Sequence, residues 1–515
     1  MTTQQVYDAA EEAVTKLVQA TGPNHKFPFD EIWGYATTNV DSAQRPAAQR
    51  HLTKQGYIEK TGLTTRASTQ ARAGSPTSEY RPGPRFRPAP TPTATPAAPP
   101  ATQPTSVADA LKEIQSQMLA RGFISTLDQL ANFYLALKTS PLVILAGTSG
   151  TGKSWLPRLF AELIGADFTH ISVQPQWSDN SDLFGYTPSL TPDTFIRGRF
   201  TDAIIQAVNK PDKPHIVLLD EMNLAAVEHY FSDFLSVIAT RKRDDQGRVI
   251  SDLLPLDVGD GVKQTEVDGV DLRALRLPHN LKVVGTANLD ETTQPFSPKV
   301  LDRATTIEYD EVDLTAFPTG DPTARNTEPL QYLAMRLIEE SDPVSVMEAY
   351  PAAPELFDHV AKLLTEVQER LKPARILIGF RPRDSVCLYL YQWQEDDLTS
   401  VIAPNKALDY ALYQKILPKV SGSGDDLDTA LLKLERWLRR QPDVEQEEET
   451  EAATGEGEAE VEVIPDGETE DGLLTGADTQ GDLASLRPPC ERSAAKVKRM
   501  RERLGSEMAT TFWGT

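Results

Sequence analysis

Eight consecutive residues combine glycines with a lysine and a hydroxyl side chain at a spacing that can hold phosphate groups. They are Gly147, Thr148, Ser149, Gly150, Thr151, Gly152, Lys153 and Ser154. The glycines allow the backbone to wrap so that its N–H groups point inward at an anion. Lys153 would reach the β and γ phosphates of a nucleoside triphosphate, and Ser154 would ligate Mg²⁺. The pattern therefore predicts a site for nucleotide phosphates.

The sequence on either side has the form that a phosphate loop requires. An apolar run at residues 142–146 predicts a buried strand before the loop, and residues 155–164 predict a helix after it. The N-terminus of that helix would add positive partial charge at the phosphates. We therefore interpret residues 147–154 as a phosphate loop rather than as a glycine-rich turn.

Polar side chains also end two later apolar runs. Asp220 and Glu221 follow residues 216–219, and Asn288 ends the run that starts at residue 281. Asp220 can hold Mg²⁺ through water, while Glu221 is placed to polarise an attacking water molecule. Asn288 can orient the same water from the other side. This set predicts hydrolysis of the nucleotide and argues against a protein that only senses it.

Three arginines are candidates for contacts with the γ phosphate. Arg303 precedes an expected strand at residues 305–309, from which it cannot easily reach its own nucleotide. In a ring it would project into the neighbouring site and stabilise the transferring phosphate, and the alternative is a surface arginine paired with Asp302. Arg381 and Arg383 start an expected helix, and either could touch the γ phosphate from the lid side.

The elements that must position these residues alternate between short strands and helices. Apolar runs at residues 142–146, 169–173, 216–219 and 281–284 predict a parallel sheet with helices on both faces. After about residue 312 the strand signal ends and amphipathic helical stretches follow. The predicted fold is therefore α/β, with a three-layer α/β/α core at residues 107–312. A helical lid is expected at 313–442, with a last helix of the lid in 487–515.

A small module is expected at residues 1–72. Helical patterns near its start, at residues 29–35 and at 45–55 lead into a strand at residue 57, which is similar to a winged-helix domain. Nine Lys and Arg side chains follow Asp41 up to residue 87, against two Glu. Such a basic face is typical of DNA binding, and the alternative is a module that docks on a protein partner.

Charge and proline content separate the remaining segments. The 515 residues include 52 Lys and Arg against 75 Asp and Glu, a net charge of −23. Fourteen of the acidic side chains lie in residues 443–471, which hold no basic one, and a disordered acidic insert is expected at 443–486. Ten prolines between residues 76 and 104 predict an extended linker at 73–106.

Composition also excludes several classes of protein. The only cysteines are Cys387 and Cys490, which excludes a disulfide framework and a Cys-rich zinc site. No run of 18 apolar residues exists, and the first residues lack the pattern of a signal peptide. We therefore expect a cytoplasmic protein without a membrane-spanning segment. We interpret His170 and His229 as packing or surface residues.

The order of phosphate loop, Asp-Glu strand, Asn strand, arginine and helical lid resembles the AAA+ superfamily. Within it, residues 174–186, 219–235 and 417–422 are similar to McrB-type NTPases, the motor subunits of modification-dependent restriction systems. Residues 492–500 and 511–513 look like that family's last helix, so the resemblance covers roughly residues 107–515. It implies a homo-oligomeric ring, expected to be a hexamer, that hydrolyses a nucleotide with Mg²⁺. It also implies DNA translocation or remodelling with an McrC-like or other nuclease subunit in anti-phage defence.

The stretch around the sensor asparagine departs from that family. McrB-type GTPases carry Met-Asn-x-x-Asp, whereas this chain has Ala287 before Asn288 and Glu291 at the Asp position. The substrate is therefore expected to be ATP or GTP, with ATP at least as well supported. A second hypothesis is an AAA+ chaperone of the MoxR type, which remodels a protein partner without DNA. Salt-sensitive DNA binding by the N-terminal region would separate the two hypotheses.

Overall fold

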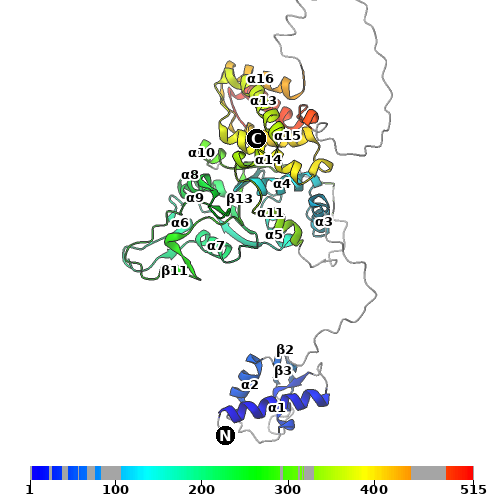
Figure 1. Ribbon diagram of the computed structural model, residues 1–515, viewed down its shortest axis with the longest axis vertical. Coiled ribbons are helices and arrows are strands. Elements are labelled where there is room, and N and C mark those ends of the chain that lie inside the picture. The colour runs from blue at the N-terminus through cyan, green and yellow to red at the C-terminus, as the bar shows by residue number, and fades with distance from the viewer. Residues whose placement is uncertain are drawn as a thin grey trace, which may run out of the picture. The chain divides into compact units, whose positions relative to one another are not determined.

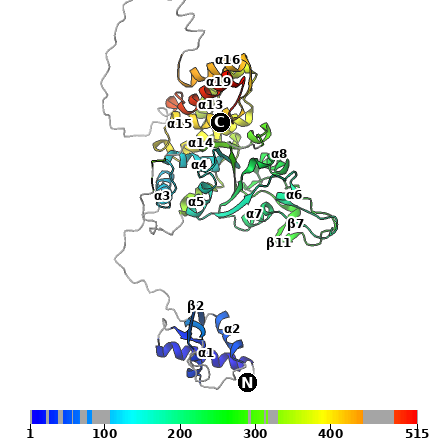
Figure 2. The ribbon, with the colours of Figure 1, turned by 180° about the vertical axis from the view of Figure 1, so that it is seen from behind.

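The computed structural model describes residues 3–21, 26–36, 44–55, 57–66, 76–82, 106–289, 294–310, 314–315, 317, 330–441 and 483–513. The chain forms two compact units, Met1–Thr102 and Gln103–Thr515 (Figures 1 and 2). Residues 83–105 of the expected linker and residues 442–482, which cover most of the expected acidic insert, lie outside the described residues. Their extended and disordered character therefore stays a prediction.

The smaller unit combines helices with a small sheet. It contains α1 (Thr3–Thr21), β1 (Phe27–Pro28), the 3-10 helix η1 (Phe29–Tyr35), α2 (Arg45–Lys54), β2 (Ile58–Arg66) and β3 (Pro76–Pro82). The three strands form an antiparallel sheet in the order β1-β3-β2. Leu17 of α1, Ile32 of η1 and Leu52 of α2 are fully buried and belong to one hydrophobic core.

Strand β3 corrects the predicted boundary between module and linker. Residues 76–82 were expected in the proline-rich linker, yet they pair with β2, with Ile58 opposite Pro82 and Arg66 opposite Pro76. Both prolines stand at the ends of the strand, where a missing N–H costs the sheet least. The module therefore extends to Pro82 instead of ending at residue 72.

The larger unit is built on a five-stranded parallel sheet, which confirms the predicted α/β core. Its strands are β4 (Leu142–Gly147), β5 (Asp167–Ser172), β8 (His215–Asp220), β13 (Leu281–Asn288) and β14 (Thr305–Glu308). Their order across the sheet is β14-β4-β13-β8-β5. The register pairs Gly147 with Asn288 and Ser172 with Asp220, so the carboxyl ends of four strands meet at one edge. Ligands of open α/β sheets bind outside this edge.

Helices cover both faces of the sheet because successive strand residues point to opposite sides. On β4, Val143 and Leu145 pack with α3 (Val107–Ala120), α4 (Leu127–Thr139) and α5 (Trp155–Ile164). Leu142 and Ile144 pack on the other face with α7 (Arg199–Val208), α8 (Val227–Tyr230) and α9 (Ser232–Val237).

Short elements extend the core, and those at residues 181–197 and 266–271 lie away from the lid (Figures 1 and 2). They are α6 (Ser181–Phe184), β6 (Gly185–Tyr186), β7 (Ile196–Arg197), β9 (Lys242–Arg243), β10 (Val249–Ile250), β11 (Glu266–Val267) and β12 (Val270–Asp271). The strands pair as three antiparallel hairpins. The short helix α10 (Pro298–Leu301) leads into β14.

The lid is helical, as predicted. It contains α11 (Gln331–Leu337), α12 (Val346–Ala349), α13 (Pro354–Leu371), α14 (Phe380–Glu395), α15 (Pro404–Lys415), α16 (Asp425–Leu438) and α19 (Glu491–Glu507). Strands β15 (Ser421–Ser423) and β16 (Ala509–Thr511) pair with each other. None of the helices in the described part of the chain combines the length and apolarity needed to cross a membrane.

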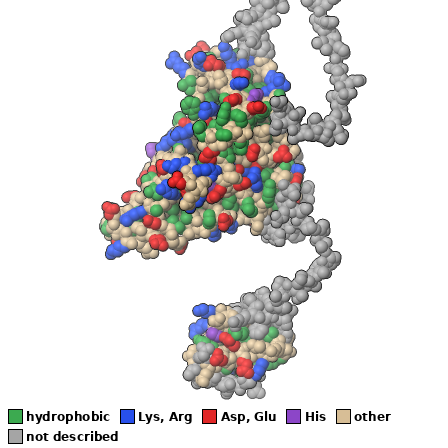
Figure 3. Space-filling view, in the orientation of Figure 1, with side chains coloured by type: hydrophobic (Ala, Val, Ile, Leu, Met, Phe, Trp, Pro, Cys, Tyr) green, Lys and Arg blue, Asp and Glu red, His purple; other side chains and the backbone are tan. Residues whose placement is uncertain are grey.

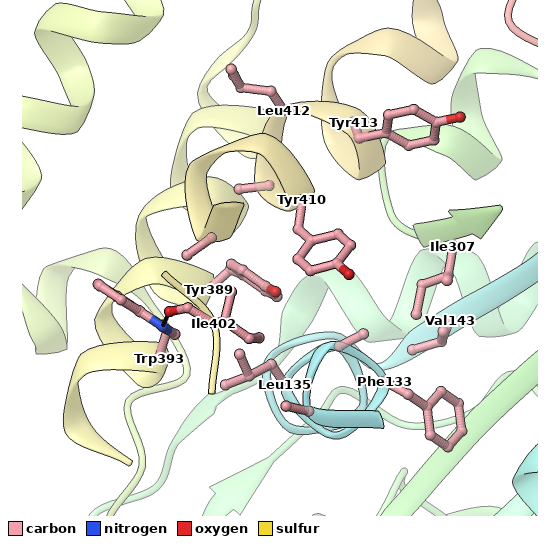
Figure 4. Close-up of a cluster of buried hydrophobic side chains, with 14 of the residues drawn as sticks. Phe133, Leu135, Val143, Ile307, Tyr389, Trp393, Ile402, Tyr410, Leu412 and Tyr413 are labelled. Carbon is pink, nitrogen blue, oxygen red and sulfur yellow. Dashed lines mark hydrogen bonds between the residues drawn. The ribbon is translucent and has the colours of Figure 1, made fainter. Parts of the chain in front are cut away.

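Lid and core share one hydrophobic cluster. Figure 4 shows Phe133 of α4 and Ile307 of β14 in the same cluster as Tyr389, Tyr410 and other lid side chains. The polar groups of these aromatics find partners across the boundary. The Tyr389 hydroxyl donates to Asn132 Oδ1 at 2.8 Å, and the Tyr134 hydroxyl donates to Asp396 Oδ2 at 3.0 Å. The lid is therefore packed on the sheet by a continuous core.

Candidate active site

The phosphate loop connects β4 to α5 and needs glycine where it touches a neighbouring strand. A Cβ on Gly147 would lie 2.5 Å from the Tyr309 carbonyl oxygen, which directly follows β14. A Cβ on Gly152 would lie 3.1 Å from the Phe123 ring, and the Gly152 φ angle of +92° also favours glycine. Close approach by β14 and by Phe123 thus holds the loop at the carboxyl edge of the sheet.

Lys153 lies inside the arch of this loop. Its ammonium group donates to the Gly147 carbonyl oxygen at 2.9 Å and also to the Thr148 carbonyl oxygen. The side chain is 5% exposed, so its charge is focused on the space that the loop encloses. This placement supports the predicted role of Lys153 toward the phosphates.

Ser154 and Asp220 meet across β4 and β8. The Ser154 hydroxyl donates to Asp220 Oδ1 at 2.6 Å, Thr286 Oγ1 donates to the same oxygen at 2.7 Å, and His170 Nε2 lies 3.1 Å from Oδ2. Burial raises the pKa of the Asp220 carboxyl, but the hydrogen bonds from these three side chains outweigh it and bring the pKa below its usual value. Asp220 is therefore a carboxylate at neutral pH.

The pair of a hydroxyl and a carboxylate fits Mg²⁺. This ion prefers oxygen ligands and keeps several waters, so two protein oxygens and the nucleotide phosphates suffice. Ser154 and Asp220 would hold it, as predicted. When bound, Mg²⁺ would neutralise charge on the β and γ phosphates.

Glu221 and Asn288 lie beside each other at the same edge. Asn288 Nδ2 is 3.5 Å from Glu221 Oε1, and the Glu221 N–H donates to Thr286 Oγ1 at 2.9 Å. Glu221 adopts the left-handed conformation, with φ 55° and ψ 48°. This turn directs the chain away from β8 immediately after Asp220. Both predicted water-orienting side chains are thus brought together with the metal ligands.

Two residues that contact the site were not predicted from the sequence. His170, which we interpreted as a packing or surface residue, contacts Asp220 from the neighbouring strand β5. The Thr286 hydroxyl donates a hydrogen bond to Asp220 and accepts one from the Glu221 backbone N–H. Thr286 lies two residues before Asn288 on β13, so a period of two from Asn288 would have indicated it. His170 depends on the strand order and had no comparable signal.

A cavity of about 730 Å³ opens beside the phosphate loop and is suited to the nucleoside. Gly150, Thr151 and Gly152 line one side, and Phe123, Trp155 and Tyr309 supply aromatic walls. Phe123 packs edge-on against Trp155 with ring centroids 5.4 Å apart. The sequence analysis missed this region because Phe123 and Tyr309 lie nearly 200 residues apart and carry no motif.

Arg303 lies at the opposite edge of the sheet. β14 runs parallel to β4 with Thr305 opposite Val143, so Arg303 is level with Pro141, about 20 Å before Gly147 at the rise of a strand. Its predicted alternative partner, Asp302, forms an ion pair with Lys419. Burial lowers the pKa of the Arg303 guanidinium, and Arg381 lowers it further. Arg303 therefore cannot reach the phosphate loop of its own chain.

The predicted contact of Arg381 or Arg383 with the γ phosphate from the lid side needs a correction. Arg381 lines a cavity of about 300 Å³ together with Arg303 and Pro141, at the amino edge of the sheet. Arg383 pairs with Asp384 at 2.7 Å and lies over the Phe380 ring. The start of α14 packs on that edge, so neither arginine lines the cavities that adjoin the phosphate loop of the same chain.

Two family models match parts of this chain. Residues 142–304 match the AAA domain (dynein-related subfamily). Residues 337–509 match a family described as a domain of unknown function (DUF8727). No curated protein matches the chain. A solved structure of a candidate ATPase from Cytophaga hutchinsonii is similar over 60% of this chain and 86% of its own, with 13% identity and a TM-score of 0.37.

The AAA domain match spans β4 with its phosphate loop, β5, β8, β13 and Arg303, whereas Phe123 and Tyr309 of the nucleoside cavity lie just outside it. The chain is therefore a nucleoside triphosphatase of the AAA+ type.

Proposed function

We propose that the chain forms a ring and uses nucleotide hydrolysis to translocate or remodel DNA, as a McrB-like motor with a partner nuclease. The observation that carries this proposal is the separation of the two arginines from their own phosphate loop. Arg303 and Arg381 share a cavity at the amino edge of the sheet, while Lys153, Asp220 and Glu221 lie at the carboxyl edge. Only a second subunit can bring these two sets together.

Exposed basic side chains on the smaller unit support DNA as the partner. Helix α2 buries Ala48 and Leu52 in the core and presents Arg50 and Lys54 to solvent. Among the described residues, neither of these cations has an ion-pair partner. On the face of the larger unit in Figure 3, Lys and Arg alternate with Asp and Glu, without a comparable basic surface. We therefore assign phosphate contacts with DNA to α2.

DNA binding by the full chain tests this assignment. The double variant Arg50→Ala, Lys54→Ala should weaken duplex binding, and the slope of log affinity against log salt should fall by about 2. Lys16→Ala is the matched control, because Lys16 is an exposed cation of α1 that pairs with Glu12 at 2.7 Å. Equal binding by the wild type and the double variant would contradict the assignment.

A steady-state assay addresses the substrate and the partner together. Turnover of ATP and of GTP is compared with and without duplex DNA. Preference for either nucleotide is compatible with the site, whereas stimulation by DNA is expected only for a DNA motor.

The match to the dynein-related AAA domain keeps a MoxR-like chaperone as the second candidate. Such a protein would remodel a protein partner and would not touch DNA. No DNA binding at low salt, with turnover unaffected by DNA, would favour the chaperone over the McrB-like motor.

A further inference from the structure

Two lysines of the lid contact the residues on either side of Arg303. The Lys415 ammonium group, at the end of α15, donates to the Ala304 carbonyl oxygen at 2.7 Å. The Lys419 ammonium group, shortly after α15, forms an ion pair with Asp302. The short segment that carries Arg303 is therefore bound to the lid both before and after that residue.

Lys415 lies in an unfavourable place for a charge. Its side chain is 7% exposed, and burial lowers the pKa of its ammonium group to about 7, with Lys419 adding to the shift and Asp302 opposing it. Among the residues that the structure describes, Lys415 forms no ion pair, and the Ala304 carbonyl oxygen is its one hydrogen-bond partner. An apolar side chain would pack here at a lower cost. The contact with Ala304 therefore points to a role at the adjacent Arg303.

The part of the lid that carries the two lysines is itself fixed to the core. Helix α15 packs beside β14, and the Tyr413 hydroxyl donates to the Glu308 carboxylate. After α15, the Pro418 carbonyl oxygen accepts from Trp513 Nε1 at 3.1 Å, and the Trp513 ring lies against Phe296 with centroids 5.1 Å apart. Both lysines therefore extend from a segment whose position on the sheet is set by packing.

The Arg303 side chain itself is held by fewer contacts. Its Nη1 donates to the Lys299 carbonyl oxygen at 2.9 Å, and its buried Nε has no hydrogen-bond partner among the described residues. The guanidinium lines the cavity that it shares with Arg381. Its position therefore depends on the backbone of residues 302–304. Because a displacement of about 1 Å can lower a rate about a hundredfold, contacts that fix this backbone matter for catalysis.

We propose that Lys415 and Lys419 position Arg303 for the γ phosphate of the neighbouring subunit. This role rests on the proposed ring, in which Arg303 acts in trans, and it adds a connection between subunits. The lid of one subunit would set the rate of hydrolysis at the phosphate loop of the next. Neither lysine touches the nucleotide, so both are positioning residues.

Steady-state turnover at a ring-forming concentration is compared for wild type, Lys415→Met, Lys419→Met and Lys419→Arg. The two methionine variants should lower kcat about ten- to hundredfold with KM unchanged, because their own phosphate loops stay intact. Lys419→Arg can keep the ion pair with Asp302 and should retain most of the wild-type rate. Lys282→Met is the matched control and should match wild type, since Lys282 of β13 is likewise a buried lysine whose pKa is lowered to about 7.

Mixing of subunits locates the defect. Lys153→Ala subunits lack a sound phosphate loop but offer an intact Arg303, so they should restore turnover at the phosphate loops of Lys415→Met subunits. Arg303→Ala subunits are defective at the same edge as Lys415→Met and should restore none. The mixture of Lys153→Ala with Arg303→Ala is the reference for recovery.

Wild-type turnover by Lys415→Met and Lys419→Met would overturn the proposal. Recovery with Arg303→Ala instead of Lys153→Ala would also overturn it, because the defect would then lie in the variant's own nucleotide site. If only the reference mixture recovers, the ring stands and the positioning role is wrong. If the reference mixture fails as well, the proposed ring is wrong and the positioning role with it. Thermal melting identifies misfolding, and Lys419→Met, at a side chain that is 20% exposed, keeps the test valid if Lys415→Met unfolds.

Discussion

One threonine hydroxyl connects the two acidic residues of the active site. Thr286 Oγ1 donates to Asp220 and accepts from the Glu221 backbone N–H, and its side chain is 2% exposed. The predicted metal ligand Asp220 and the predicted water-orienting residue Glu221 are therefore positioned by the same atom, on the strand β13 that lies between β4 and β8. A change of this atom should affect turnover more than nucleotide binding.

We predict that Thr286→Val lowers kcat about ten- to hundredfold, because a buried N–H left without a partner costs about 1–3 kcal/mol. Valine keeps the shape of threonine, so the fold should persist. Nucleotide affinity should change less than kcat, since Lys153 and the loop are untouched. Thr306→Val on β14 is the control, because Thr306 is equally buried and lies outside the site. A fall in affinity alone would show that Thr286 shapes the binding site instead.

A buried lysine at the amino edge of the sheet predicts a pH-dependent stability. Lys282 is 3% exposed, and its pKa is lowered to about 7 by burial and by Arg241, with Lys138 adding to the shift and Asp342 opposing it. Between about pH 7 and its unfolded pKa of 10.5, the folded state binds fewer protons than the unfolded state. Lys282 therefore destabilises the fold fully below pH 7, and this effect fades as the pH rises to 10.5.

Lys282→Met should accordingly raise the melting temperature at pH 6.5 and lose most of that gain near pH 10. The gain at low pH is on the order of a few kcal/mol, since each pKa unit corresponds to about 1.4 kcal/mol. Differential scanning fluorimetry across this range measures it. A gain that is constant with pH would mean that packing, and not charge, is the cause.

At the scale of elements, α19 and β14 are joined by a buried ion pair. Lys496 contacts Glu308, and the Tyr413 hydroxyl of α15 donates to the same carboxylate. Arg492 Nη2 also donates to the Glu308 carbonyl oxygen at 2.9 Å. These contacts bind strand β14, which follows Arg303, to helix α19, which lies beside the phosphate loop.

We predict that Lys496→Met destabilises the chain by about 3–5 kcal/mol, because it leaves the Glu308 carboxylate buried without its cation. The double variant Lys496→Met, Glu308→Gln should recover much of that loss. Lys498→Met, which removes one charge of an exposed pair, should cost less than about 1 kcal/mol. Urea unfolding distinguishes these cases. A double variant as unstable as the single one would show that the buried charge is not the main cost.

At the scale of the whole molecule, the active site is divided between subunits in our proposal. Arg303 cannot reach its own phosphate loop, and its buried Nε atom has no hydrogen-bond partner among the residues that the structure describes. An arginine supplied in trans can contribute about 10³–10⁵ in rate in related phosphoryl-transfer enzymes. Arg303→Ala should therefore bind nucleotide but hydrolyse it poorly.

Mixing two inactive variants tests this division. Lys153→Ala subunits keep a sound Arg303, and Arg303→Ala subunits keep a sound phosphate loop. Mixtures at high concentration should regain part of the wild-type rate at interfaces that pair the two. Each variant alone at the same total concentration is the control. Mixtures that stay as inactive as either parent would rule out a trans-acting Arg303.

Local sequence was sufficient for the parts of this protein that depend on neighbouring residues. The strand at residues 142–146, the loop with Lys153 and Ser154, and the helix at 155–164 were predicted from one continuous stretch, and the helix bounds agree with α5. Asp220, Glu221 and Asn288 were predicted because each ends an apolar run. The carboxyl ends of parallel strands meet at one edge, so these residues converge in any sheet of this kind.

The end of the smaller unit was predicted less well. Proline content placed residues 76–82 in a linker, whereas the structure pairs them as β3. A proline-rich composition predicts a linker because proline lacks an N–H donor. Composition does not show, however, that Pro76 and Pro82 stand at the two ends of a strand. These residues form a strand because they pair with β2, which ends ten residues earlier.

What the sequence by itself determined is thus the parallel sheet and the triphosphatase reaction, together with the positions of the residues predicted to bind phosphate and metal and to orient water. Only the tertiary structure decided which other side chains reach the active site. His170 and Thr286 join it through the strand order, while Arg303 and Arg381 lie at the opposite edge. Lys415 contacts the residue after Arg303 because α15 packs beside β14. These contacts join residues up to 111 positions apart in the chain, and they depend on strand order and helix packing, to which no local pattern is sensitive.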